Sequence, residues 1–436
     1  MLDIGIAMFV GALVLIALRM PVGVAMLLVG GLGYAVISGW MPLLATLRSI
    51  TFSKFSSYTL SVIPLFLLMG DFATKGGLNR ALFAAARAWL GHRRGGLALA
   101  TIGGCAAFGA ICGSSLATAA TMSQVALPEM RKQGYSPALS TGTLAAGGTL
   151  GILIPPSVIL VIYAIYTEQS IGVLFVAAVI PGILAMLGYM AVVALYARLV
   201  PAAAPPAPRI PWRERWRPTL EVWPVLLVFG LVITGIYAGW FSATEGAAVG
   251  AVATGVIAVA LGGMRWAGLK ESLLSTAETT GLIFIVLLGA ELFSAALALS
   301  RLPAELSAAI AGLDVPPLVV LAMILVIYFV LGCFMESMAM VLLTLPIFVP
   351  LMLALDFGLN PAQVMVWFGI LVLVSVEVGM ISPPFGLNLF VINGMAKDVP
   401  MAQTYRGVAG FVASDVVRIV ILVAAPALSL WLPGLW

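Results

Sequence analysis

Long apolar segments joined by short polar connections make up most of the chain. A helix needs about 20 apolar residues to cross a bilayer, so segments of this length are predicted to be membrane spans. They are residues 2–18, 21–40, 58–75, 138–166, 171–198, 218–240, 243–262, 276–299, 361–396 and 407–432. Two further stretches, 95–132 and 315–355, are too long for one span and contain a polar break near the middle. We interpret each of these two as a re-entrant hairpin.

A motif that occurs twice interrupts two of the predicted spans. It reads Gly151-Ile-Leu-Ile-Pro155-Pro156 in the first half of the chain and Gly379-Met-Ile-Ser-Pro383-Pro384 in the second. A proline pair interrupts the hydrogen bonds of a helix, and unpaired backbone groups at membrane depth are costly unless something binds them. Each motif therefore predicts a broken helix and a candidate binding site.

Composition excludes a water-soluble globular protein. Of the 436 residues, 62% are hydrophobic and only 9% are charged, which leaves too little polar surface to cover a soluble fold. The pattern predicts an all-α polytopic membrane protein with about 10 to 11 membrane-spanning helices. The three cysteines, Cys105, Cys112 and Cys333, lie in apolar surroundings and are predicted to pack as small apolar side chains.

The formal net charge of +4 does not indicate nucleic-acid binding. In a membrane protein, an excess of Lys and Arg marks the cytoplasmic connections. Placing both termini in the periplasm leaves most of the basic residues on the cytoplasmic side, with Arg48, Lys54 and Arg301 outside. Arg48 and Lys54 follow the second span, in a connector that is either an amphipathic arm on the membrane or a solvated loop.

The proline-rich stretch 201–217 divides the chain into two halves. Its proline density predicts a cytoplasmic linker without helix. Residues 1–200 form the first predicted repeat, with scaffold helices in 1–57, and residues 218–436 form the second. Each half contains five membrane crossings and one hairpin. Because five is an odd number, the second half enters the membrane from the opposite side, so the two halves have inverted topology. Inverted repeats with broken helices are typical of secondary transporters.

Small and oxygen-bearing residues gather at the hairpin tips and at the breaks. Backbone carbonyls, hydroxyls and carboxylates are hard oxygen ligands of the kind that Na⁺ prefers. Two pseudo-symmetric cation sites are predicted, each with a tip facing a break, and a substrate pocket between them. The first comprises Gly113, Ser114, Ser115, Gly148, Thr149 and Gly151, and the second comprises Gly332, Glu336, Gly379 and Ser382, with Asn388 facing the same tip.

Acidic residues inside predicted spans are functional candidates because a charge at membrane depth is costly. They are Asp71, Glu245, Glu291, Glu336, Glu377 and Asp415. Asp415 lies one helical turn from Arg418, which favours a structural ion pair. Glu336 at a tip and Glu377 before a break are the candidates for a proton relay, if protons rather than Na⁺ drive transport.

Five segments together resemble the large membrane subunit of tripartite ATP-independent periplasmic (TRAP) transporters, the DctM-like family. They read PLFLLMGDFATKGGL, CGSSLATAA, GGTLGILIPPS, ESMAM and GMISPPFGLN. The resemblance covers nearly the whole chain and implies an elevator-type fold of the ion transporter superfamily. It implies a bacterial or archaeal inner-membrane importer that uses Na⁺ to take up organic acids such as C4-dicarboxylates or sialic acid.

The same resemblance implies two partners, a small four-helix membrane subunit and a periplasmic solute-binding protein. By similarity, Gly113, Ser114, Ser115, Gly148 and Gly151 would line one Na⁺ site, and Gly332, Gly379 and Ser382 the other. Solute contacts are assigned as hypotheses to Thr118, Pro156, Ser157, Ser337, Pro384 and Asn388.

Two alternatives stay open. One is a stand-alone symporter of the divalent-anion/Na⁺ type, which would need no binding protein. The other is a polytopic membrane enzyme, which the sequence disfavours because it contains no His/Asp metal cluster and no Ser/His nucleophilic arrangement. The identity of the solute and the ion stoichiometry do not follow from the sequence.

Overall fold

A computed structural model describes residues 1–312 and 315–435, which form helices and connecting turns without a β-strand. The helices of the first half are α1 (Leu2–Ala17), α2 (Val22–Ser38), α3 (Trp40–Phe55), α4 (Val62–Lys75), α5 (Leu78–Leu90), α6 (Gly96–Cys112), α7 (Ser115–Lys132), α8 (Pro137–Leu153), α9 (Val158–Tyr166) and α10 (Ile171–Leu199). Those of the second half are α11 (Trp212–Leu220), α12 (Trp223–Tyr237), α13 (Ala243–Ala260), α14 (Trp266–Ser300), α15 (Leu302–Ala311), α16 (Pro317–Gly332), α17 (Ser337–Ala354), α18 (Pro361–Met380), α19 (Leu387–Met395), α20 (Met401–Ala424) and α21 (Ala427–Leu430). Short 3₁₀ turns lie at Tyr58–Ser61, Pro201–Ala203 and Pro433–Leu435.

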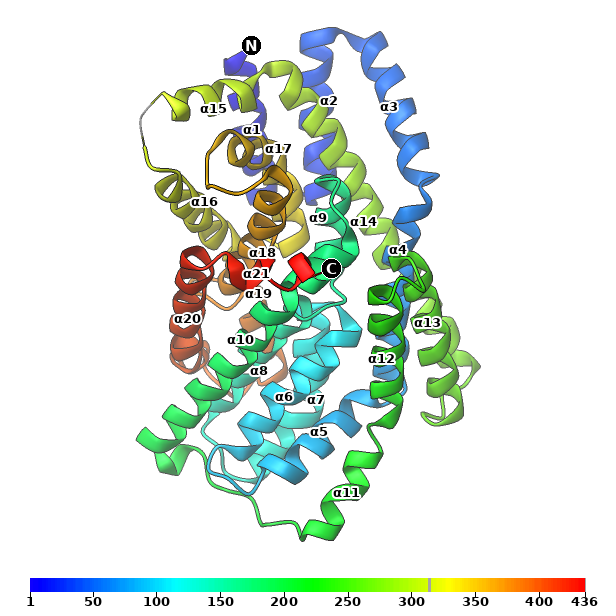
Figure 1. Cartoon of the computed structure of the whole chain (residues 1–436), viewed down its shortest axis with the longest axis vertical. Helices are drawn as coiled ribbons and strands as arrows, with labels where there is room; N and C mark the ends of the chain where they lie inside the picture. The colour runs from blue at the N-terminus through cyan, green and yellow to red at the C-terminus, as the bar shows by residue number, and fades with distance from the viewer. Residues whose placement is uncertain (313–314, 436) are drawn as a thin grey trace.

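Both predicted hairpins and both predicted broken helices are present. Helices α6 and α7 form the first hairpin, and α16 and α17 form the second (Figure 1). Helices α8 and α9 bend by 41° at the first proline pair. Helices α18 and α19 are separated at the second pair by residues 381–386. The all-α polytopic fold expected from the hydrophobic pattern is confirmed.

Several described helices are long and apolar enough to cross a bilayer. Six meet this description singly, and up to nine do so if each bent pair is counted as one span. The shorter helices α1, α2, α6 and α16 are apolar as well. Large exposed hydrophobic side chains cover the outer helices, as expected for surfaces that face lipid.

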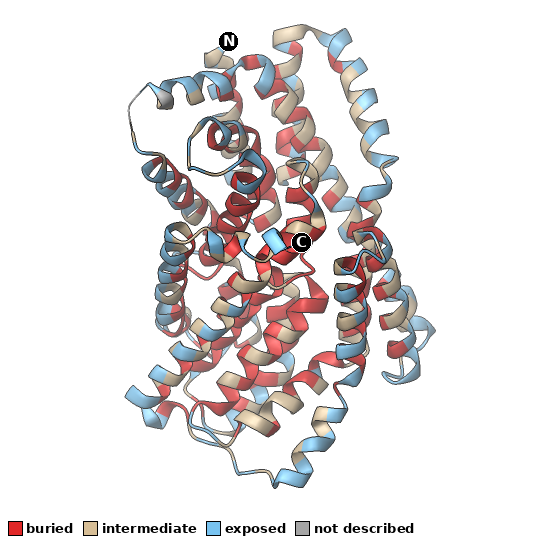
Figure 2. Cartoon of the chain, viewed as in Figure 1, coloured by how far each residue is buried: buried red, intermediate tan, exposed pale blue. Residues whose placement is uncertain are grey.

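The two broken helices form the centre of the molecule (Figure 2). Every residue from Leu139 to Leu153 in α8 is buried, and so is every residue from Val364 to Met380 in α18. A helix that is apolar on all sides belongs in a protein interior. The first break lies within the packed core, where residues 155–157 are buried, whereas the second break is exposed at residues 383–385.

Helices from the two halves pack across each other. Helix α2 of the first half lies along α14 of the second, and α13 of the second half lies along α4 of the first (Figure 1). Glycines permit the first approach: a Cβ atom added at Gly30 would lie 2.8 Å from the Cα of Phe293. This reciprocal packing is what inverted repeats would produce, and the division into two repeats stays a prediction.

The connector after the second predicted span is helical. Residues 40–55 form α3, of which only Leu43 is buried, and α3 is bent by 55° from the segment Tyr58–Lys75 that follows. Lys54 at its end lies 3.1 Å from the carboxylate of Glu291 on α14. The second-half counterpart differs, because α14 begins at Trp266 and continues unbroken to Ser300.

The prediction of a helix-free linker over 201–217 is wrong in part. Residues 212–220 form α11, which begins after Pro211 and contains Pro218 near its end. The six residues between these prolines are Trp, Arg and Glu, which are compatible with a helix. Glu214 in the first turn and Arg217 in the last also match the helix dipole. The prediction rested on the average proline content over 201–217 and therefore missed this short helix.

Candidate functional site

The tip of the first hairpin packs directly on the first break. A Cβ atom added at Gly109 would lie 2.6 Å from the Cα of Gly151, so the two backbones meet without side chains between them. Gly113 at the tip adopts a left-handed conformation with a φ of 64°, which favours glycine. A Cβ atom there would lie 3.0 Å from the carbonyl oxygen of Pro156. The predicted pairing of this tip with this break is present in the structure.

The second tip meets the second break in a similar way. A Cβ atom added at Gly332 would lie 3.1 Å from the Cα of Gly379. The backbone N–H of Gly386 donates to the carbonyl of Cys333 over 3.1 Å, and the thiol of Cys333 lies 3.6 Å from the carbonyl of Pro383. Hydrogen bonds therefore fix this hairpin tip to the loop that contains the proline pair.

A buried polar cluster connects the first tip to the second broken helix. The hydroxyl of Ser115 donates to Oε2 of Glu377 over 2.9 Å, and Nδ2 of Asn388 donates to Ser115 Oγ over 3.2 Å. The same amide nitrogen lies 3.3 Å from the carbonyl of Ala145 on α8. We expected Asn388 to face the second tip, and this was wrong: it lies against the first tip and the first broken helix.

Two oxygen atoms of this cluster lack a hydrogen-bond donor among the described residues. They are Oε1 of Glu377 and Oδ1 of Asn388, and both side chains are fully buried. No Lys or Arg of the described chain forms an ion pair with Glu377. A buried carboxylate is costly unless it is paired or coordinates a cation. Hard oxygen donors without a hydrogen-bond partner suit Na⁺.

Three of the predicted site residues cap helices. Ser114 accepts from the N–H of Ala117 at the start of α7, and Ser157 accepts from the N–H of Leu160 at the start of α9. Glu336, an exposed residue, accepts from the N–H of Ala339 over 3.1 Å at the start of α17. These side chains satisfy backbone donors at the points where the chain re-enters a helix.

Other predicted site hydroxyls have partners away from the Ser115 cluster. Thr149 bonds to Tyr189 on α10, Ser382 in the second break donates to the carbonyl of Val378 at the end of α18, and Ser337 lies 2.7 Å from the sulfur of Met380. Their side-chain oxygens are thus engaged within the protein.

The remaining predicted residues lie at the two breaks. Gly148 lies beside the cluster, because a Cβ atom there would be 3.1 Å from Asn388 Nδ2. Thr118 is fully buried and lies against Gly151. Pro156 is buried, whereas Pro384 is exposed and its carbonyl accepts from the hydroxyl of Tyr405.

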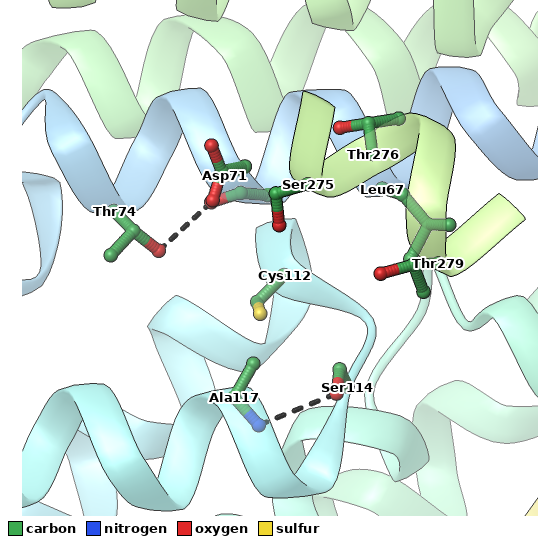
Figure 3. Close-up of a pocket in the computed structure, with 10 residues that line it drawn as sticks. Leu67, Asp71, Thr74, Cys112, Ser114, Ala117, Ser275, Thr276 and Thr279 are labelled. Atoms are coloured by element: carbon green, nitrogen blue, oxygen red, sulfur yellow. Dashed lines mark hydrogen bonds between the residues drawn. The ribbon is translucent and has the colours of Figure 1, made fainter. Parts of the chain in front are cut away.

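A polar cavity of about 170 Å³ lies beside the first tip (Figure 3). It is enclosed by the tip, by α4 and by α14, so residues from both halves line it. Its polar lining consists of Asp71, Thr74, Ser114, Ser275, Thr276 and Thr279. Of these, Ser114 is a predicted site residue and Asp71 is one of the acidic candidates, whereas the four other hydroxyl residues were not predicted. The run Ser275-Thr276-Ala277-Glu278-Thr279-Thr280 in α14 was the available signal, because hydroxyls three and four residues apart share one helix face.

The acidic residues that were predicted to lie inside spans differ in exposure and in ion-pair partner. Glu245 is exposed and forms a capping box with Ser242 at the start of α13, so its assignment to the membrane interior is corrected. Asp71 lies 3.7 Å from Lys75. Asp415 is buried and pairs with Arg418 over 2.9 Å, as the one-turn spacing predicted.

Comparison with known proteins relates this geometry to a family. The model of the family described as "Tripartite ATP-independent periplasmic transporter, DctM component" matches residues 9–428. The chain belongs to the DctM family. This membership makes it a large permease subunit of a TRAP transporter and not an enzyme.

Relatives within the DctM family carry names with different solutes. The chain is 37% identical to the "C4-dicarboxylate TRAP transporter large permease protein DctM" of Pseudomonas aeruginosa over 89% of this chain and 90% of that one. It is 31% identical to the "Isethionate TRAP transporter permease protein DctMQ" of Oleidesulfovibrio alaskensis, over 96% of this chain and 65% of that longer protein. Family membership alone therefore leaves the solute open.

A solved structure shares the fold of this DctM-family chain. The crystal structure of the Alcanivorax borkumensis YdaH transporter matches with a TM-score of 0.61, at 15% sequence identity and over 89% of each chain. At this identity the likeness concerns the arrangement of the helices alone.

Proposed function

We propose that this TRAP permease subunit couples the inward movement of Na⁺ to the uptake of a small organic acid. The observation that carries the proposal is the buried cluster of Ser115, Glu377 and Asn388. Its carboxylate lacks a cationic partner within the described chain, and two of its oxygens lack a donor. A bound cation would supply the missing charge and accept these oxygens as ligands. Ser115, Glu377 and Asn388 are the residues that would hold it.

The proposal includes a second Na⁺ site at the second tip. Gly332 and Gly379 meet there without side chains between them, and Cys333 is bonded to the loop at the second break. The hydroxyl of Ser382 donates to the carbonyl of Val378 at the end of α18, so its oxygen keeps lone pairs for a further partner. Among the described residues this site has no counterpart of the Ser115–Glu377 contact, so the first site is the better supported of the two.

The solute is proposed to bind in the polar cavity beside the first tip. Hydroxyl groups on α14 and α4 line it, together with Ser114 at the N-terminus of α7 and the carboxylate of Asp71, which pairs with Lys75 over 3.7 Å (Figure 3). Helix N-termini and hydroxyl donors favour anionic groups. The relatives named for C4-dicarboxylate and isethionate transport support a small organic acid as the class of solute.

Transport is proposed to follow an elevator mechanism in the bacterial or archaeal inner membrane, with both termini in the periplasm. The hairpins and broken helices would move as one body against α1, α2, α12 and α13. A small four-helix membrane subunit and a periplasmic binding protein are the proposed partners. The longer relative named DctMQ supports a second membrane subunit, because about a third of it lies outside the match.

Uptake by reconstituted vesicles tests the proposal. The chain is reconstituted with its small membrane subunit and its binding protein, and uptake of labelled C4-dicarboxylate or isethionate is measured with and without an imposed Na⁺ gradient. We expect uptake that requires the gradient and all three proteins. Uptake that follows a proton gradient and ignores Na⁺ would contradict Na⁺ coupling. Uptake by this chain alone would contradict the three-component mechanism and favour a stand-alone symporter.

Ser115→Ala is expected to raise the Na⁺ concentration for half-maximal uptake by about threefold to tenfold, because one hydrogen bond to Glu377 is lost. Uptake measured against Na⁺ concentration checks this. Ser140→Ala is the matched control, since Ser140 is also buried but donates to the carbonyl of Ser136 in its own helix. An unchanged Na⁺ dependence in Ser115→Ala would remove Ser115 from the site.

A further inference from the structure

Helix α11 carries tryptophan and arginine side chains at the end of a membrane span. It reads Trp-Arg-Glu-Arg-Trp-Arg-Pro-Thr-Leu and lies at the lower edge of the molecule in Figure 1, below α12. Only Glu221 and Val222 separate it from α12, and the two helices are bent by 50° from each other. Helix α12 is apolar and α11 carries arginine and tryptophan, residues that are typical of the membrane–water interface.

The tryptophans of α11 form one ring cluster with Trp89 of α5. Trp212 and Trp216 lie edge-on to Trp89, with ring centroids 5.1 Å and 5.5 Å apart. The indole N–H of Trp89 donates to the hydroxyl of Thr219 over 2.8 Å. The cluster still leaves 60% of Trp212 and 46% of Trp216 exposed. Partly exposed tryptophan at the end of a span is typical of the headgroup region of a bilayer.

Arginine side chains surround this cluster. The guanidinium of Arg215 lies 5.9 Å from the ring centroid of Trp89 and 5.7 Å from that of Trp212, and its Nε donates to the carbonyl of Ile210 over 2.9 Å. The other basic residues of this surface are exposed, and they are Arg93, Arg94, Arg209, Arg213 and Arg217. Glu214 and Glu221 are the acidic residues of the same segment, so the surface carries a net positive charge.

The chain before α11 is fixed to the base of the first hairpin. The N–H of Gly95 donates to the carbonyl of Ala204 over 3.1 Å, and that of Ser136 donates to the carbonyl of Ala203 over 2.9 Å. The N–H of Ala207 donates to the carbonyl of Gly91 over 2.9 Å. The basic surface is therefore a defined part of the fold. Burial also lowers the pKa of the His92 side chain, and the positive charge of Arg215 lowers it further.

We propose that α11 and the end of α5 form a binding surface for the headgroups of anionic phospholipids. The exposed arginines would contact phosphate groups, and Trp212 and Trp216 would lie among the glycerol and headgroup atoms. Clusters of four to eight basic residues next to a span attract anionic lipids, and an amphipathic segment with tryptophan adds apolar contact. Charge complementarity and attachment to the end of α12 favour a lipid over a soluble partner.

A label on α11 allows this surface to be tested in the full-length chain. The three native cysteines are buried, so Glu214→Cys introduces an exposed thiol that a fluorescent bimane group can modify selectively. The purified protein in a neutral detergent is titrated with short-chain phosphatidylglycerol, and the change in emission gives an apparent affinity. Phosphatidylcholine of the same chain length and inorganic phosphate are titrated in parallel.

We expect Arg213→Gln/Arg217→Gln to weaken the apparent affinity for phosphatidylglycerol about tenfold, because two exposed charges are removed. The double variant with Lys at both positions should retain the affinity. Arg265→Gln/Lys270→Gln is the matched control: it removes two exposed charges near the start of α14 and should change nothing.

Three results would overturn the proposal. The first is an equal response to phosphatidylcholine, and the second is an equal response to inorganic phosphate, which would indicate a site for free anions. The third is an unchanged affinity in Arg213→Gln/Arg217→Gln with an elution volume like that of the parent protein.

Discussion

Glu377→Gln is expected to raise the Na⁺ concentration for half-maximal uptake by about tenfold to a hundredfold, the largest effect on transport of any single change considered. The substitution keeps the size of the side chain and removes its charge. Interactions with a charged partner contribute about 1.5 to 3 kcal/mol. Since Glu377 is fully buried and has no ion-pair partner among the described residues, a bound cation would lose its only close carboxylate in this cluster. Uptake against Na⁺ concentration in reconstituted vesicles measures the effect.

Ser375→Ala is the matched control for this prediction. Ser375 is fully buried and lies two residues earlier in α18, and residues two apart point to different faces of a helix, so it does not share the face of Glu377. Removing that hydroxyl should leave the Na⁺ dependence unchanged. If Glu377→Gln retained the Na⁺ dependence but abolished a dependence on external pH, Glu377 would be a proton relay and the cation site would have to lie elsewhere.

The positions of the helices could be predicted from local sequence alone. Apolar length placed both hairpins, and the two proline pairs placed both breaks, within a few residues of the structure. These features depend on neighbours along the chain, because a proline pair interrupts a helix wherever it stands. The error over α11 has a related origin: the prediction averaged over the whole segment, whereas the helix begins directly after Pro211 and contains Pro218.

The composition of the buried cluster could not be predicted from local sequence. Ser115 and Glu377 are 262 residues apart, and their contact depends on how the two halves pack. We paired each tip with the break of its own half, so Asn388 was assigned to the second tip. The structure places Asn388 between Ser115 and Ala145, which makes the first site a product of both halves.

The lining of the cavity beside the first tip could not be predicted from local sequence either. Its hydroxyls on α14 belong to a long helix that otherwise reads as an ordinary span. Ser275, Thr276 and Thr279 become a polar wall only because α14 lies opposite the tip and α4. A run of hydroxyls at helical spacing inside an apolar segment would have identified this face, but not what it faces.

Removing either partner of the Asp415–Arg418 pair is expected to cause the largest loss of stability. Both side chains are buried, at 0% and 5% exposure, and they lie 2.9 Å apart. Tyr189 donates to the second oxygen of Asp415 over 2.7 Å and bonds to Thr149 at the first broken helix over 3.0 Å. Asp415→Leu leaves a buried guanidinium without a counter-charge, and Arg418→Met leaves a buried carboxylate without one. Such a change lowers the free energy of unfolding by about 3 to 5 kcal/mol.

The double variant Asp415→Leu/Arg418→Met distinguishes pairing from simple packing. A buried ion pair replaced by apolar side chains of similar size is often neutral or stabilising, so the double variant should unfold at nearly the same denaturant concentration as the parent protein. Tyr189→Phe removes the hydrogen bonds to Asp415 and to Thr149, and it should lower the free energy of unfolding by about 1 to 3 kcal/mol. Denaturant unfolding of the parent protein and the four variants in detergent gives their free energies of unfolding. Single variants as stable as the parent protein would show that this ion pair within α20 contributes nothing to stability. A double variant that loses the sum of both single effects would show that each side chain acts independently.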